Sequence, residues 1–125
     1  MKIYKCTNCG NMLEVIVDGA IVPVCCSKPM DIIKTNTNED ALQEKHVPIY
    51  TKDKNKIQVY VGSVLHPMNK DHYIEWIVLK TDKGIYRKYL KPVDTPSITF
   101  LLSNDDEEVI NIYAYCNIHG LWSIN

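Results

Sequence analysis

The sequence has no long hydrophobic run and no excess of charge of either sign. Its 125 residues include 14 Lys and Arg against 15 Asp and Glu, so the formal net charge is −1. No segment approaches the roughly 18 consecutive apolar residues that a transmembrane helix requires. No basic stretch favours nucleic acid or an anionic membrane surface, and the first residues contain no apolar core of a signal peptide. We therefore expect a soluble cytoplasmic protein.

The sequence also lacks internal repeats, low-complexity segments and a convincing 3.6-residue period of apolar residues. Apolar and alternating segments bounded by turn residues predict strands instead, over 11–17, 20–24, 57–61, 73–80, 85–90, 97–102, 109–116 and 121–124. Asp18-Gly19 predicts a hairpin turn between the first two segments. The spacing of the later strands is typical of a β-sandwich, so the predicted fold class is all-β.

The chain is predicted to contain two domains. The polar, turn-rich segment 35–40 indicates a linker that begins near residue 36. The residues before it are too few to bury a hydrophobic core, so a metal ion would have to hold them together. We predict a small metal-stapled domain over residues 1–36 and a β-sandwich domain over residues 37–125.

The five cysteines and four histidines form two groups along the chain. The first group is Cys6, Cys9, Cys25 and Cys26, and the second is His46, His66, His72, Cys116 and His119. An odd number of cysteines in a protein expected in a reducing compartment favours metal binding over disulfides.

The first group contains a Cys-x-x-Cys knuckle and an adjacent cysteine pair. Four thiolates suit a tetrahedral zinc or iron ion, and the spacing alone does not choose between an iron electron-transfer centre and a structural zinc site. Adjacent side chains diverge along an extended backbone, so we expect a distorted tetrahedron at Cys25 and Cys26. A disulfide between these two residues is an alternative that a reducing compartment disfavours.

The second group combines one cysteine with four histidines. Cys116 shares its strand parity with Ile110, Ile112 and Ala114, so its sulfur is predicted to face an apolar interior. A thiolate there needs a cation. Each histidine taken alone is more simply a hydrogen-bonded or surface residue, and the spacing does not show that all five side chains meet. Five ligands at one ion would leave one position open, which favours iron and chemistry over a closed zinc site.

Five motifs in order resemble the desulfoferrodoxin form of superoxide reductase over nearly the whole chain. They are the four N-terminal cysteines with Pro29-Met30, then Glu44-Lys45-His46-Val47-Pro48, then Gly62–Met68 with His72–Ile77, then Leu90-Lys91-Pro92, and finally Cys116-Asn117-Ile118-His119-Gly120. Two positions depart from the family pattern, because Ser27 stands where glycine is frequent and Tyr73 stands where tryptophan is common.

This resemblance implies a desulforedoxin-like domain with one iron ion and an immunoglobulin-like β-sandwich with a second. The first iron would be bound by Cys6, Cys9, Cys25 and Cys26, where isolated protein can hold zinc instead. The second would be bound by His46, His66, His72 and His119, with Cys116 as the axial ligand.

The implied reaction is the one-electron reduction of superoxide to hydrogen peroxide. Lys45 would attract the anionic substrate, and Glu44 would approach the oxidised iron after the product leaves. The implied partners are a rubredoxin-like electron donor and a second copy of the chain. A non-catalytic iron electron-transfer protein is the alternative interpretation.

Overall fold

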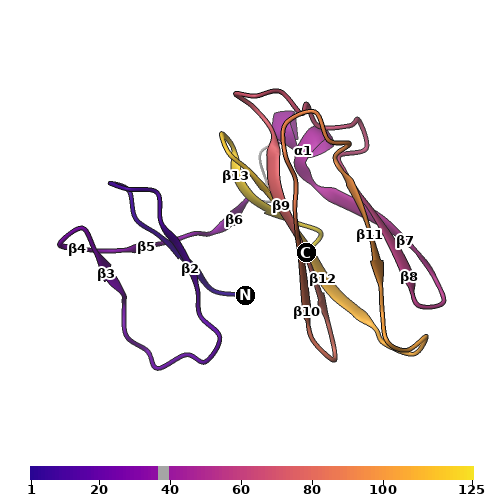
Figure 1. Ribbon diagram of the computed structural model, residues 1–125, viewed down its shortest axis with the longest axis horizontal. Helices are drawn as coiled ribbons and strands as arrows, with labels where there is room; N and C mark the ends of the chain where they lie inside the picture. The colour runs from indigo at the N-terminus through magenta and orange to yellow at the C-terminus, as the bar shows by residue number, and fades with distance from the viewer. Residues whose placement is uncertain (37–39) are drawn as a thin grey trace. The chain divides into compact units, whose positions relative to one another are not determined.

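The computed structural model describes residues 1–36 and 40–125, and nearly all of their regular structure is β (Figure 1). The described chain divides into two compact units, Met1–Lys34 and Thr35–Asn125. The all-β fold class predicted from the sequence is confirmed.

The N-terminal unit contains two small sheets. The central strand β1 (Ile3–Lys5) pairs antiparallel with β2 (Met12–Glu14) and with β5 (Asp31–Ile32). Strand β3 (Val24–Cys25) forms a short hairpin with β4 (Lys28–Pro29). The buried cluster of this unit is small and consists of Tyr4, Cys6 and Met30, with Val15 and Cys25 packed against it. Because two of its five members are cysteines, little apolar surface is available to stabilise the unit without a metal ion.

The predicted hairpin around Asp18-Gly19 is wrong. Residues 15–23 form no strand, and β2 pairs with β1 instead. A local turn through the side chain stands there instead, because the Asp18 Oδ1 atom accepts a hydrogen bond of 2.8 Å from the Ala20 N–H group. Asp18 therefore initiates a turn through its side chain, but the flanking residues do not continue as a paired ladder.

The second unit is a sandwich of a five-stranded and a three-stranded sheet. The first has the order β10-β9-β12-β13-β6 and the second has the order β11-β8-β7. The strands are β6 (Thr35–Asn36), β7 (Pro48–Asp53), β8 (Lys56–Val61), β9 (Ile74–Thr81), β10 (Ile85–Tyr89), β11 (Ser97–Leu101), β12 (Val109–Cys116) and β13 (Gly120–Ser123). Neighbouring strands are antiparallel, except that β6 runs parallel to β13.

The core of the sandwich lies between the inward faces of these sheets. Alternate residues of β8 show the pattern, since Ile57, Val59 and Val61 are fully buried while Lys56 and Tyr60 are exposed. They pack with Phe100, Ile77, Leu79, Ile112, Ala114 and Cys116 from the other strands. Burial of each large apolar side chain contributes about 1.5–3 kcal/mol, so the core of this unit stabilises it far more than the three-residue cluster stabilises the N-terminal unit.

The helix α1 (Asp40–His46) was not predicted from the sequence. Seven residues make only about two turns, which is too short for a hydrophobic period to be visible. Strand β7 was also missed, and β6 occupies the start of the predicted linker. Residues 37–39 of that linker lie outside the described part of the chain. No helix in the described ranges is long and apolar enough to cross a membrane.

Candidate metal centres

The four N-terminal cysteines converge on one point in the first unit. Their sulfur atoms all lie within 4.8 Å of one another. The Cys9 and Cys25 sulfurs are 3.6 Å apart, and the Cys25 and Cys26 sulfurs are 4.0 Å apart. Four thiolates bound tetrahedrally at about 2.3 Å from one ion would be about 3.8 Å apart. The donor set therefore fits a tetrahedral metal ion.

Backbone turns bring these sulfurs together. Gly10 follows the Cys6–Cys9 knuckle with a φ of +81°, and its N–H group donates to the Cys6 carbonyl at 2.9 Å. Cys26 and Ser27 are the central residues of the β3–β4 turn and have φ values of 50° and 62°. A two-residue hairpin turn of this hand requires positive φ at both positions. This left-handed backbone accompanies a distance of 4.0 Å between the Cys25 and Cys26 sulfur atoms. Cys26 and Ser27 are strained, because neither is a glycine.

The surroundings of Cys6 and Cys25 shift the pKa values of these two thiols in opposite directions. Backbone N–H groups of Cys9 and Asn8 lower the pKa of Cys6 to about 6. The neighbouring sulfurs of Cys9 and Cys6 raise the pKa of Cys25 to about 12. The fold thus stabilises the Cys6 thiolate, whereas the neighbouring sulfur atoms disfavour the thiolate form of Cys25. A bound metal ion removes this conflict, because it deprotonates coordinating thiols.

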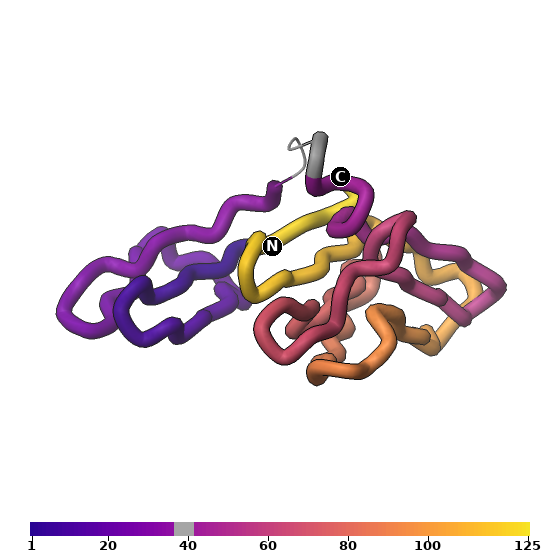
Figure 2. The backbone as a smooth tube through the Cα atoms, turned by 90° about the horizontal axis from the view of Figure 1, so that it is seen from above, coloured from indigo at the N-terminus to yellow at the C-terminus, as the bar shows by residue number. Residues whose placement is uncertain are grey.

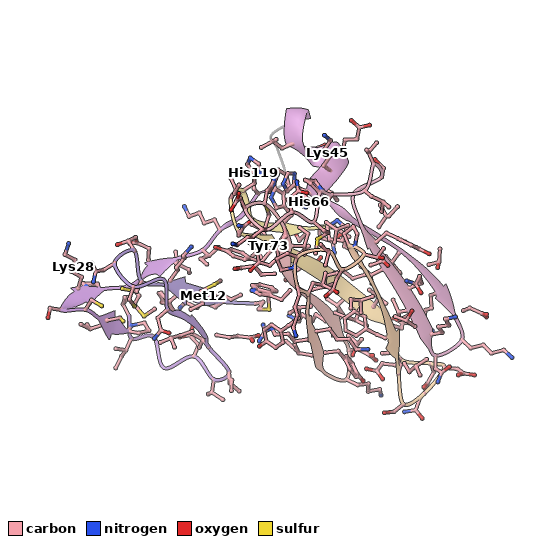
Figure 3. The ribbon with its side chains drawn as sticks, turned by 45° about the horizontal axis from the view of Figure 1, so that its top comes forward. Met12, Lys28, Lys45, His66, Tyr73 and His119 are labelled. Carbon is pink, nitrogen blue, oxygen red and sulfur yellow. The ribbon has the colours of Figure 1, made fainter. Side chains whose placement is uncertain are left out.

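Four imidazole rings form a closed square in the second unit. Neighbouring ring centroids lie 4.6 Å apart for His46 and His66, 4.6 Å for His66 and His72, 5.0 Å for His72 and His119, and 4.7 Å for His119 and His46. Each neighbouring pair is close to perpendicular, and the His46–His72 diagonal is 6.2 Å. Figure 3 shows Lys45, His66 and His119 near one another at one end of the sandwich.

Different elements supply the four rings. His46 ends α1, His66 and His72 lie within the loop between β8 and β9, and His119 precedes β13. Figure 2 shows the C-terminal strands in yellow beside the end of α1. At this point His46 stacks on Trp122 of β13, with ring centroids 4.8 Å apart.

Hydrogen bonds leave ring nitrogens of this square without a proton. His46 Nδ1 lies 2.8 Å from the Leu42 carbonyl oxygen, and His66 Nδ1 lies 2.6 Å from the Pro67 carbonyl oxygen. Because a carbonyl only accepts, both Nδ1 atoms carry the hydrogen of the neutral ring. The two Nε2 lone pairs then face each other at 3.1 Å, while the buried His72 Nε2 atom has no hydrogen-bond partner. Such an arrangement is repulsive unless a cation lies between the nitrogens.

A metal ion is a more suitable cation than a proton to lie between these ring nitrogens. Burial lowers the pKa of His66 to about 4 and also lowers the pKa values of His46 and His72. The lowered pKa values favour the neutral form of His46, His66 and His72 at pH 7, which is the form that binds metals. Two nitrogens bound at right angles to one ion at about 2.1 Å would lie about 3.0 Å apart. The 3.1 Å between His46 and His66 agrees with that separation.

Cys116 lies on the core side of the imidazole square and is fully buried. Its sulfur is 3.8 Å from His119 Nδ1 and accepts a hydrogen bond of 3.4 Å from the His119 backbone N–H group. Burial raises the pKa of Cys116, so the thiolate needs a cation beside it. The sulfur of Cys116 and ligand atoms of His46, His72 and His119 all lie within 4.8 Å of one another.

The predicted parity of β12 is confirmed near Cys116 and wrong at its start. Ile112 and Ala114 are buried in the same core as Cys116, whereas Ile110 is 46% exposed. A register shift between Val109 and Asn111 reverses the alternation there.

Glu44 and Lys45 are exposed residues in the last turn of α1, directly before His46. The positive charge of Lys45 contributes to the lowered pKa values of His46 and His72, after burial and the neighbouring histidines. The Lys45 ammonium group is thus the cation that acts electrostatically on these two rings.

Sequence reasoning missed the residues that orient the rings. Asn117 Oδ1 accepts a hydrogen bond of 2.9 Å from the Tyr73 N–H group, and Asn117 Nδ2 donates to the Asp71 carbonyl at 3.0 Å. Its side chain therefore holds both chain neighbours of His72. The only available signal was the position of Asn117 inside the Cys-x-x-His motif. The Leu42 and Pro67 carbonyls leave no signal in the sequence, because every residue carries one.

Comparison with known proteins places the chain in a family. Residues 38–125 match the family model described as desulfoferrodoxin, and residues 1–33 match the model for the N-terminal domain of desulfoferrodoxin. A desulfoferrodoxin homolog of Archaeoglobus fulgidus is 46% identical over 122 residues, which cover 98% of this chain and 94% of that protein. The desulfoferrodoxin of Nitratidesulfovibrio vulgaris is 46% identical over 97% of this chain and 93% of its own length.

Solved structures agree with this assignment. The superoxide reductase of Treponema pallidum matches 100% of this chain and 98% of its own, with a TM-score of 0.82 and 33% identity. A superoxide reductase of Giardia intestinalis matches 64% of this chain and 94% of its own, with a TM-score of 0.54 and 27% identity. The four-cysteine set and the set of four histidines and one cysteine match the two-iron members of the family. This chain belongs to the desulfoferrodoxin family.

Proposed function

We propose that this protein is a superoxide reductase that converts superoxide, with one electron and two protons, to hydrogen peroxide. The observation that carries the proposal is the square of four imidazole rings beside a buried thiol. It is supported by membership of the desulfoferrodoxin family and by structural similarity to superoxide reductases.

In this proposal His46, His66, His72 and His119 bind one iron ion together with Cys116, and Cys6, Cys9, Cys25 and Cys26 bind another. Bound iron in the second site supplies the electron that superoxide accepts. The orphaned Nε2 of His72 and the facing lone pairs of His46 and His66 support this ligand assignment. Carbonyl oxygens on the Nδ1 atoms of His46 and His66 fix the orientation of these two rings.

Lys45 attracts the anionic substrate. The net charge of the chain is −1, so the whole molecule does not favour an anion and attraction must be local. The Lys45 ammonium group is exposed and acts on His46 and His72. Glu44 is the neighbouring exposed carboxylate, and we propose that it approaches the same site after the product has left.

The Cys116 thiolate favours loss of an electron from the site. With iron bound, Cys116 would be an anionic, strongly electron-donating ligand in a fully buried position. The His119 N–H group limits this donation by its hydrogen bond to the sulfur. Protons for the product would come from water, because His72 and His119 are half-buried and so partly accessible to solvent.

Four further properties belong to this proposal. The functional division is residues 1–36 for the first iron and residues 37–125 for the second. A rubredoxin-like protein supplies electrons, two chains form a homodimer, and the protein works in the cytoplasm. The two family-model matches, over residues 1–33 and 38–125, support the division into two parts. The electron donor, the homodimer and the compartment follow from the resemblance to desulfoferrodoxins.

A product count tests the reaction. Iron-loaded protein is reduced without air, a known dose of superoxide is added, and peroxide, dioxygen and oxidised iron are measured. One peroxide for each second-site iron oxidised, with no dioxygen beyond spontaneous dismutation, is the expected result. Equal peroxide and dioxygen with no net oxidation of iron would indicate a dismutase. A reaction no faster than buffer alone would favour a non-catalytic electron carrier.

A further inference from the structure

The end of α1 is held by a turn from another element. Helix C-termini leave carbonyl groups without intrahelical partners, and α1 has only seven residues. The Glu44 carbonyl oxygen accepts hydrogen bonds from the Val64 N–H group and from the Ser63 hydroxyl, both at 3.2 Å. The Val47 carbonyl oxygen accepts a third bond, of 3.1 Å, from the Gly62 N–H group. The turn after β8 therefore caps the helix from outside.

Gly62 allows the two backbones to approach closely. Its φ is +86°, and a Cβ atom there would lie 2.3 Å from the Val64 carbonyl oxygen and 2.7 Å from the Lys45 carbonyl oxygen. Both contacts are with backbone atoms, so neither can be relieved by rotation of a side chain. Glycine is the residue that accepts such a φ and such a distance without strain.

These contacts hold the main chain of Glu44 and Lys45, the two residues proposed to act on superoxide and the iron site. A helix of seven residues is marginal by itself in water, so the position of Glu44 and Lys45 depends on what their main chain contacts. His46 is fixed by its ring contacts and by its bond to the Leu42 carbonyl. The described bonds that hold the Glu44 carbonyl come from Ser63 and Val64.

We propose that Ser63 and Gly62 are positioning residues that hold Glu44 and Lys45 beside the imidazole square. Ser63 acts through its hydroxyl group, and Gly62 acts through the absence of a side chain. This inference rests on the proposed function, because it assigns the turn a role in capturing superoxide. Neither residue contacts the substrate in this proposal.

The substitution Ser63→Ala tests the inference, with Ser63→Thr as the variant that keeps the hydroxyl. Thr51→Ala, on exposed β7, is the matched control for loss of a hydroxyl elsewhere in the same unit. Two quantities are measured on iron-loaded protein. One is the hydrogen-exchange rate of the Val64 amide, and the other is the rate at which the reduced protein captures superoxide at low and at high ionic strength.

We expect Ser63→Ala to speed exchange at Val64 about fivefold, the change typical of losing one neutral hydrogen bond in a shared acceptor site. Capture at low ionic strength should fall by about threefold and should lose part of its salt dependence, because a less localised Lys45 attracts the anion less effectively. The iron content of both sites should stay unchanged. Ser63→Thr should restore both rates, and Thr51→Ala should change neither.

Unchanged exchange at Val64 in Ser63→Ala would overturn the inference. Faster exchange with unchanged capture at low ionic strength would also overturn it, since the hydroxyl would then stabilise the turn without positioning Lys45. These results leave the proposed function standing if the wild-type protein captures superoxide. A wild-type protein that does not react with superoxide would remove the proposed function and this inference together.

Discussion

At the scale of single residues, Lys45 is expected to control the encounter with superoxide. Lys45→Ala should slow capture by the reduced protein about tenfold at low ionic strength, because local steering of charged substrates is of this order or larger. The difference should shrink as salt screens the charge. Stopped-flow or pulse-radiolysis measurements of iron oxidation would give the rates.

Lys56→Ala is the control for Lys45→Ala, because Lys56 is an exposed lysine of β8 in the same unit. It removes the same net charge without touching α1. Equal effects of the two substitutions would show that the capture rate depends on the overall charge and not on the position of Lys45. An unchanged rate in Lys45→Ala at low salt would contradict the steering role directly.

Val93 carries backbone strain that one substitution can relieve. This β-branched residue has a φ of 69° and is 92% exposed, and its N–H group donates to the Met68 carbonyl at 2.9 Å. A left-handed conformation costs an L-residue about 1–2 kcal/mol, and asparagine adopts it more readily. Val93→Asn should therefore stabilise the second unit by about 1 kcal/mol, measured by thermal unfolding. Val93→Thr keeps the branched side chain and should give little change, whereas equal stabilisation by both would implicate polarity instead.

At the scale of structural elements, Asn117 connects the turn after β12 with the His72 loop. Its side chain bonds to Asp71 and Tyr73 on either side of His72. Asn117→Ala removes both bonds and should weaken iron binding at the second site about tenfold, as loss of outer-sphere support commonly does. Competition with a chelator measures this affinity. The four-cysteine site in the same molecule is the internal control, and equal losses at both sites would contradict the prediction.

The far end of the sandwich contains a buried carboxylate that links β9, β10 and the acidic turn before β12. Glu107 is 1% exposed and accepts hydrogen bonds from the Thr81 and Tyr86 hydroxyls, the latter at 2.8 Å. The bond to Glu107 raises the pKa of Tyr86 above its ordinary value of 10.0. The folded state therefore favours the protonated phenol. The resulting stabilisation is complete below pH 10 and is lost as the pH rises through the folded-state pKa.

Tyr86→Phe should lower the urea midpoint at pH 7, because buried Glu107 loses one hydrogen-bond donor. The difference between variant and wild type should narrow above pH 10, where the phenol of the wild type ionises. Tyr89→Phe is the control, since Tyr89 lies on the same strand and is 74% exposed. If the difference in urea midpoint between Tyr86→Phe and wild type stays constant from pH 7 to pH 11, ionisation of Tyr86 does not contribute to stability.

The elements that the sequence predicted are those with strong local patterns. Strand β8 alternates, β9 and β12 are long apolar runs, and turn residues bound each of them. The α1 helix, the pairing of β2 with β1, and the register shift in β12 depend on contacts between distant residues. The approach of the four imidazole rings to Cys116 also depends on such contacts between distant residues. Spacing identified the two donor groups, and only the fold shows that His46, His66, His72 and His119 form a square.

At the scale of the whole molecule, the two units should respond differently to loss of metal. The buried cluster of the N-terminal unit has three residues, Tyr4, Cys6 and Met30, whereas that of the second unit has twelve. Structural metal ions supply folding free energy directly to small domains. Removal of both ions should therefore unfold residues 1–34 and leave the sandwich folded.

The chain allows this difference to be measured. Both tryptophans, Trp76 and Trp122, lie in the second unit and are buried there, so their fluorescence reports that unit alone. After treatment with a strong chelator under reducing conditions, we expect the tryptophan emission maximum to stay at the wavelength of buried indole, together with rapid amide exchange across 1–34. Cys26→Ala, which removes one ligand of the first site, should give the same pattern while the second site keeps its iron. Protected amides in 1–34 of the metal-free protein would show that its small core is enough to keep this unit folded. The four thiols would then be needed for electron transfer and not for folding.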